Sequence, residues 1–592
     1  MHPDIQILQR PGGPKDWPSK AHSTEKLDKL MKRIVYKSAS LVMALLMATG
    51  LSLASGSDEK SGKNTNQVPL AGMVSVTNHD GPKTAKHLKI GIWNTAGNIT
   101  TYTIGNSWND WLLWLSYDKL REPSPYVGQA DDWLATDIKQ VSDDARNWEI
   151  TLRDGVKWHD GTDFTAEDVA FTFEYYREGP ANRWTHHTSA VPRMEKIEVL
   201  DRLKLRITSK MPMPNFDVIT ATDLPIIQKA QWENVKNPRG FTDIGIGTGP
   251  YMLVDYKADE YYKYKANPNY WKGKPLVEEL TLVMIKDPQT MFTALKTGEL
   301  DGAARSLPPE LVKQWAADPD IEIAKAPSLW GTWLDINLAR KPFDNRQLRQ
   351  AISLAIDPEP MLKRVMLGMG KSGTYGWPHV DSFWTRPDMK VSYDPAKAMT
   401  ILDEQGYVDS NGDGIRDLPD GTPLTWIIKA ASNRPLLMRA SEMVVSQLAE
   451  VGIKSRVETM DPASFAGLWK SREYDLRVMD ITPHGIADQD MLIILYKGDS
   501  KAALVQEPEK DAIVKRWLEA GTREDRLKVS YELQDYQNKY PNRVMLWYPD
   551  GLFAYRWKAY DNYASSAGYG IFHKYSFLPR PARTGTAEEL VK

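Results

Sequence analysis

Strand and helix signals alternate along the chain from Leu88 onward, and this alternation constrains the fold more than any other feature. The run 88–93 predicts an opening strand, and 148–152 predicts another that ends at a turn. Thr165 is the predicted N-cap of a helix, because Asp168 stands at the third helical position and apolar residues then recur at helical spacing. Mixed elements of this kind predict layered α/β domains.

Later segments continue the same alternation. The sequence predicts a strand over 275–285 and a helix over 287–297 that ends at Gly298. Further amphipathic helices are predicted over 346–356 and over 441–451, the second stopped by the glycine that follows it.

The amino-terminal region predicts export. From Met31, a basic start precedes an apolar run over about 39–53, and small residues stand at Ser52 and Ala54. This pattern is typical of a secretory signal, so we expect cleavage after Ala54 and assign 1–54 to leader and signal. The apolar run is shorter than the ~20 residues of a membrane-spanning helix, and a retained short anchor is the alternative.

Two neighbouring stretches complete this region. We expect translation to begin at Met31, because the preceding residues are polar and lie outside the signal pattern. Residues 55–85 are rich in Ser, Gly, Asn, Thr and Lys, which predicts a flexible tether.

Composition excludes several classes. The chain has no cysteine, which rules out disulfides, thiolate zinc sites, cysteine nucleophiles and thiol-linked lipid anchors. Its net charge of −2 gives no reason to expect nucleic acid or an anionic membrane as a partner. The motifs G-x-S-x-G, H-E-x-x-H and the phosphate-binding loop are missing from the sequence, and we expect no enzyme activity and no cofactor. The adjacent pair His186-His187 has no supporting metal ligands around it and is interpreted as a solvated loop.

An ordered set of short segments resembles one family. The first is WEITLRDGVKWHDG at 148–161, followed by FTAEDVAFTFEY at 164–175. The later segments, in chain order, are GTGPY at 247–251, NPNYWKGKP at 267–275, LKTGELD at 295–301, RQAISLAID at 349–357, DPAKA at 394–398 and GYVDSNGDGIRDLPDG at 406–421. Together they resemble family 5 extracytoplasmic solute-binding proteins, the oligopeptide, dipeptide and nickel binding subunits of ABC importers.

The resemblance implies an α/β, two-lobed periplasmic binding protein fold with an extra domain inserted in lobe one. Matching positions imply these boundaries: lobe one at 86–125, 245–328 and 545–592, the inserted domain at 126–244, and lobe two at 329–544. The segments 330–337 and 544–548 would cross between the lobes. The implied protein is an unlipidated periplasmic monomer that captures oligopeptides or similar-sized solutes. It would deliver them to an ABC permease and ATPase complex at the inner membrane.

The resemblance also gives an expectation about the ligand. In peptide-binding members an aspartate pairs with the α-ammonium group of the peptide, and the matching position here is His484. Asp480 and Asp488 lie nearby and could substitute for it. A buried ammonium needs a paired carboxylate, so we expect unmodified dipeptides to bind weakly.

Aromatic residues keep a second ligand class open. The chain has 21 Trp against 12 Phe, and flat indole faces suit sugar rings as well as peptide side chains. An oligosaccharide ligand is therefore an alternative to a peptide, and core packing is the other interpretation of these side chains. The candidate ligand contacts in or near the crossing segments are Trp93, Trp330, Trp333, Asp335, Trp547 and Tyr548.

A calcium-loop pattern occupies 409–420. Oxygen-bearing side chains fall at positions 1, 3, 5, 9 and 12 of that pattern, with Gly414 at position 6. The predicted ligands of a structural calcium ion are Asp409, Asn411, Asp413, Asp417 and Asp420. The alternative is a hairpin loop rich in Gly and Asp without metal, since the last ligand is Asp rather than Glu.

Two further functions fit parts of the pattern. A secreted glycoside hydrolase would use two carboxylates, but no pair stands out among the 77 acidic residues. A sensor that reports its ligand state to a membrane receptor would share the same fold, and the sequence does not separate it from a transport protein.

Overall fold

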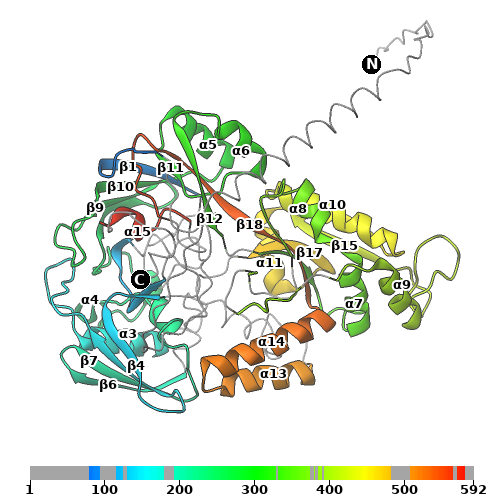
Figure 1. Ribbon diagram of the computed structural model, residues 1–592, viewed down its shortest axis with the longest axis horizontal. Helices are drawn as coiled ribbons and strands as arrows, with labels where there is room; N and C mark the ends of the chain where they lie inside the picture. The colour runs from blue at the N-terminus through cyan, green and yellow to red at the C-terminus, as the bar shows by residue number, and fades with distance from the viewer. Residues whose placement is uncertain are drawn as a thin grey trace, which may run out of the picture. The chain divides into compact units, whose positions relative to one another are not determined.

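The structure is a computed structural model of the chain, shown in Figure 1. It describes residues 79–93, 115–123, 130–178, 193–328, 331–373, 379–380, 384–389, 392–481, 507–564 and 570–579. Within these segments, no helix is both long and apolar enough to cross a membrane. The predicted signal and tether lie outside the described residues, apart from the last residues of the tether.

One half of the main sheet is built around β1 (Ala85–Ile92). This strand pairs in parallel with β10 on one side and with β11 on the other. Antiparallel β9 and β8 extend the sheet beyond β10. The bounds are β8 (Tyr251–Lys257), β9 (Tyr261–Ala266), β10 (Val277–Met284) and β11 (Gly302–Ala303).

The other half of the sheet has its own parallel core. Here β15 pairs in parallel with both β16 and β17, and β17 pairs antiparallel with β13. The bounds are β13 (Gly331–Ile336), β14 (Gly370–Ser372), β15 (Thr425–Ala431), β16 (Lys454–Met460) and β17 (Leu476–Ile481).

A single long strand, β18 (Arg543–Arg556), joins the two halves. Its first residues pair with β13 and β14, and its last residues pair with β11 and with β12 (Ile321–Pro327). The pairing of β18 passes from β14 to β12 between Pro549 and Asp550, directly after the predicted crossing segment 544–548, while β13 lies within the predicted segment 330–337. The assignment of these segments as crossings between lobes stays a prediction. Figure 1 shows β18 running from one half of the sheet to the other.

A separate four-stranded antiparallel sheet has the order β4-β5-β7-β6. Helix α3 packs on β6 and β7, and its start follows the prediction, since the backbone N–H of Thr165 donates to Asp168 Oδ2 at 3.0 Å. We call β4–β7, α3 and residues 210–222 the four-stranded module. The bounds are β4 (Ala135–Gln140), β5 (Asn147–Leu152), α3 (Ala166–Glu178), β6 (Met194–Asp201) and β7 (Lys204–Ser209), and the short β2 (Arg121–Pro123) and β3 (Ala130–Asp132) pair with each other nearby.

The apolar cores follow this division. One cluster combines module residues such as Trp148 and Phe173 with Leu282 of β10, so the module shares its core with the β1 half. Helices α5 (Pro288–Thr297) and α6 (Pro309–Trp315) also lie on that half. The other half carries α7 (Arg346–Ala355), α8 (Pro358–Arg364), α9 (Pro395–Glu404), α10 (Pro435–Glu450), α11 (Pro462–Ser471), α13 (Pro508–Glu519) and α14 (Arg523–Lys539). The remaining short helices are η4 (Thr220–Thr222), α4 (Lys229–Trp232), η5 (Pro238–Gly240) and α15 (Lys574–Phe577).

Most predicted elements occur where the sequence placed them. The strand predicted over 275–285 is β10, and the helix predicted over 287–297 is α5. The Asp287 side chain caps α5 by accepting from the Thr290 N–H, and Gly298 ends it with a left-handed φ of 85°. One helix start was wrong, because α10 begins at Pro435 rather than at 441. Proline suits the first helical turn, where a backbone N–H has no intrahelical partner.

Candidate functional site

Charged side chains from both halves of the sheet stand where parallel strands end. The carboxyl ends of β1, β10 and β11 share one edge, and Arg305 follows β11 there. In the other half, Arg434 follows the carboxyl end of β15, and Asp480 lies near the carboxyl end of β17. Ligands of open α/β sheets bind outside the carboxyl ends of the strands, which makes this edge the candidate site.

An ion pair between two helices shows that the two strand edges lie close to each other. Helix α6 follows Arg305 and helix α10 follows Arg434, and Glu310 Oε1 of α6 lies 4.0 Å from Arg439 Nη1 of α10. Both side chains are about half exposed, so the pair marks proximity more than it supplies stability.

Arg305, Arg434 and Asp480 form what we call the strand-end charge cluster. Arg434 Nη1 donates to Asp480 Oδ2 at 2.6 Å. Arg305 is half-buried and makes no hydrogen bond or ion pair to another residue of the described segments. Burial lowers the pKa of the Arg305 guanidinium and the charge of Arg434 lowers it further, while Asp480 and Asp287 act in the opposite direction. Arg434 is already bonded to Asp480, whereas Arg305 is near Asp480 and Asp287 without a hydrogen bond to either, so its N–H donors suit an anionic group.

Sequence reasoning placed Asp480 in the site but missed both arginines. Arg305 lies two residues after the last residue of β11, and Arg434 lies three after the last residue of β15. A charged residue directly after a buried strand is a signal that could have found them.

The aromatic candidates divide into three groups. Trp93 is partly buried and directly follows β1, at the same edge as Arg305. Trp333, Trp547 and Tyr548 are buried in β13 and β18, with exposed fractions of 1% or less. Trp330, His484 and Asp488 lie outside the described residues. The ligand contacts proposed for these side chains stay predictions.

Asp335 is buried inside β13 and binds two arginines from its neighbouring strands. Its Oδ2 accepts from Arg477 Nε at 2.9 Å and from the Tyr474 hydroxyl at 3.0 Å, and its Oδ1 accepts from Arg543 Nε at 3.0 Å. Burial raises the pKa of Asp335, but the adjacent charges of Arg477 and Arg543 outweigh it and leave the pKa below its ordinary value. These bonds join β13 to β17 and to β18.

The predicted calcium loop folds around its own acidic side chains. Asp409 accepts from the backbone N–H groups of Gly412 at 2.7 Å and Gly414 at 2.9 Å. Asp420 accepts from the Thr422 N–H, and Asp417 pairs with Pro423 as an antiparallel bridge, which is a hairpin arrangement. In the part of the chain that the structure describes, no group of three acidic or histidine side chains is placed to hold a metal ion. Calcium binding stays a prediction.

Solved structures share this fold. NikZ from Campylobacter jejuni, in complex with Ni(L-His), superposes with a TM-score of 0.74 and 23% identity over 84% of this chain and 100% of that one. The oligopeptide-binding protein AppA from Bacillus subtilis, in complex with a nonapeptide, superposes with a TM-score of 0.69 and 20% identity, again over 84% of this chain and 100% of that one. The mixed α/β chain therefore has the two-lobed fold of periplasmic binding proteins, as predicted.

Sequence comparison identifies the family. The profile of bacterial extracellular solute-binding proteins, family 5 (middle region), matches residues 130–503, which is more than half of the chain. The chain belongs to this family of ABC-importer binding proteins, and the resemblance noted in its motifs is confirmed.

Two relatives show the range of the family. Heme-binding protein A of Haemophilus influenzae is 27% identical over 426 residues, which cover 67% of this chain and 75% of that protein. The glutathione-binding protein GsiB of Salmonella paratyphi A is 30% identical over 328 residues, covering 54% of this chain and 59% of that protein. Both relatives are named for the ligand that they bind.

Replacing Asp335 with alanine is expected to destabilise the fold strongly. The change leaves two buried guanidinium groups without their carboxylate, which costs about 3–5 kcal/mol. Urea unfolding followed by tryptophan fluorescence measures the loss. The control is Glu524→Ala, which removes an exposed partner of Lys528 and costs less than about 1 kcal/mol. Equal losses for the two variants would contradict the structural role of Asp335.

The same ion pairs predict a dependence on pH. Because the folded-state pKa of Asp335 is depressed, its contribution to stability is full above the unfolded pKa of about 4 and is lost as pH falls through the lower folded value. The difference in unfolding free energy between wild type and Asp335→Asn should therefore narrow in acid. A difference that stays constant from pH 7 to the acid limit of folding would contradict this.

The calcium prediction is tested by thermal unfolding with excess Ca²⁺ and with a chelator. A bound ion should raise Tm by about 2 °C or more, and Asp409→Asn should remove that shift. The control is Asp388→Asn, which alters an exposed pair with Arg386 elsewhere. Equal Tm values with calcium and with chelator would support the metal-free hairpin.

Proposed function

We propose that this chain is the periplasmic solute-binding subunit of an ABC importer for oligopeptides or solutes of similar size. The observation that carries the proposal is the strand-end charge cluster, which draws residues from both halves of the sheet in a family 5 chain. A solute held by both halves would favour the closed arrangement of the lobes, because it interacts more strongly with that form. The closed protein would then deliver the solute to its membrane permease.

The charges of the cluster favour a solute that carries a carboxylate. The guanidinium of Arg305 has its donors available within the described chain, and a planar carboxylate can accept two of them at once. A peptide supplies such a group at its carboxyl terminus. Asp480 already pairs with Arg434, which supports the expectation that a free α-ammonium group is recognised weakly.

The ligands of the relatives fit this chemistry. Heme and glutathione, after which two relatives are named, both carry carboxylates, and AppA was solved with a nonapeptide. The oligosaccharide alternative keeps one support, since an oligopeptide-binding protein from Thermotoga maritima with a TM-score of 0.65 and 22% identity was solved with mannohexaose.

Export of the protein is a separate part of the proposal. The signal over 31–54 predicts that the mature chain begins at Ser55 and is not lipidated. Amino-terminal sequencing of the secreted protein tests this, and a sequence that starts at Met1 or Met31 would contradict it.

The solute itself is the most informative test. Protein purified from the periplasm is denatured, and the released small molecules are identified by mass spectrometry. We expect a peptide or another solute with a carboxylate, and calorimetry with the same compound should reproduce the binding. Release of a neutral oligosaccharide would contradict the acidic solute, and shortening of an added oligosaccharide would favour the hydrolase.

Replacing Arg305 with alanine should weaken binding of the identified solute. Loss of a charge-assisted bond costs about 1.5–3 kcal/mol, which is roughly a tenfold rise in Kd or more. Calorimetry measures the change. The matched control is Arg340→Ala. This exposed arginine pairs with Asp475, which precedes β17, so it lies at the end of β17 away from Asp480. An unchanged Kd for the Arg305 variant would contradict its role.

A further inference from the structure

Helix α14 belongs to the second half of the sheet but reaches the four-stranded module. Its apolar residues pack with Trp333 of β13 and Trp517 of α13, which fixes α14 to that half. On the module side, Arg523 pairs with Asp217, and Arg523 Nε donates to Asn215 Oδ1 at 3.2 Å.

A second arginine of the same helix makes a parallel contact. Arg526 lies one turn after Arg523, and its Nη2 donates to the backbone carbonyl of Pro212 at 2.9 Å. Two arginines thus join the helix to the segment 212–217 that follows β7.

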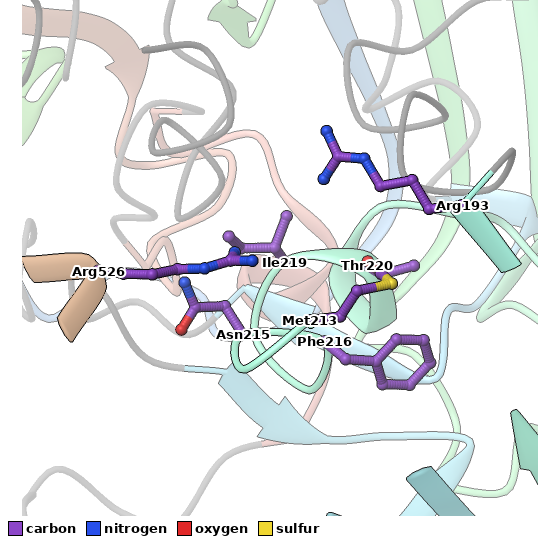
Figure 2. Close-up of a pocket in the computed structure, with 7 residues that line it drawn as sticks. All are labelled: Arg193, Met213, Asn215, Phe216, Ile219, Thr220 and Arg526. Carbon is purple, nitrogen blue, oxygen red and sulfur yellow. The ribbon is translucent and has the colours of Figure 1, made fainter. Parts of the chain in front are cut away.

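The hydrogen bonds and the ion pair of this contact come from two arginines of α14, and a small pocket lies beside them. The module core is continuous with the β1 half, while the apolar side chains of α14 belong to a different cluster. Figure 2 shows a small pocket between the two, with Arg526 on one side. Its lining residues are Arg193, Met213, Asn215, Phe216, Ile219, Thr220 and Arg526. Interfaces between domains that lack a large apolar area permit relative motion.

Each side of the contact is held in place by its own neighbours. Asp217 also accepts from Arg121 Nη1 at 3.2 Å, and Arg121 pairs in turn with Asp132. Arg526 lies over the ring of Trp517 at 4.0 Å from its centroid. The partners therefore keep their positions when the contact opens, which lowers the entropy lost when it forms again.

We propose that Arg523 and Arg526 form a latch that holds α14 against the four-stranded module and stabilises the closed arrangement of the lobes without solute. The latch rests on the lobe closure of the proposed function but on no particular solute. The latch raises the population of the closed form before solute is present. The solute then binds this form and raises its population further.

The test uses pulsed electron paramagnetic resonance on solute-free protein. Because the chain has no cysteine, two introduced cysteines are the only sites that react with the spin label. Lys196→Cys on β6 and Lys515→Cys on α13 place exposed labels on the module and on the α13–α14 pair. With both latch arginines in place, the distance between the two labels should be mainly the short one of the closed form.

Variants of Arg523 should shift this distribution in a graded way. Arg523→Ala should lower the closed-to-open ratio about fivefold, Arg523→Glu should lower it more, and Arg523→Lys should retain part of it. The matched control is Arg516→Ala, whose partner Glu532 lies within the α13–α14 pair, and it should leave the distances unchanged. An unchanged distribution for Arg523→Glu, with an unchanged Tm, would overturn the latch. Solute binding plays no part in this measurement, so a wrong proposed function and a missing latch give different results.

Discussion

The shared strand β18 is the constraint on which the rest of the structure depends. Its hydrogen bonds belong to both halves of the sheet, so the halves are joined by main-chain pairing instead of a free linker. A change in the angle between the two halves must bend β18 between its pairing with β13 and its pairing with β12. Asp335 lies in β13 and binds Arg543 at the start of β18, which ties the join to the core of the second half.

This join also determines where binding residues can come from. Each half has its own set of parallel strands, and the strands of each set end at a common edge. Residues of short loops at the two edges are brought close without being part of either core. Arg305 and Arg434 occupy such positions, and they come from segments that are far apart in the sequence. The candidate site is thus a product of topology, and arginine at those two positions would favour an anionic group.

Local signals predicted much of the fold, and long-range consequences were harder to predict. The cap residues Thr165 and Asp287 mark helix starts because they act within one turn. Asp335 was expected as a ligand contact, but whether an acid in a strand faces solvent or two buried arginines depends on strands distant in sequence. For Trp333 and Trp547 the sequence left ligand contact and core packing both open, and the structure places both side chains in the core. The sequence predicted only Asp480 of the charge cluster. Arg305 and Asp480 belong to different halves of the sheet, and only the folded structure shows that the two lie close together.

The proposed solute binds between residues of both halves of this sheet. A crystal structure of the protein purified from the periplasm with its own solute tests this most directly. We expect solute density in contact with Arg305 on one side and Arg434 on the other, with an anionic group between the two guanidinium groups. Density that contacts residues of one half alone, or a solute held away from both arginines, would contradict it.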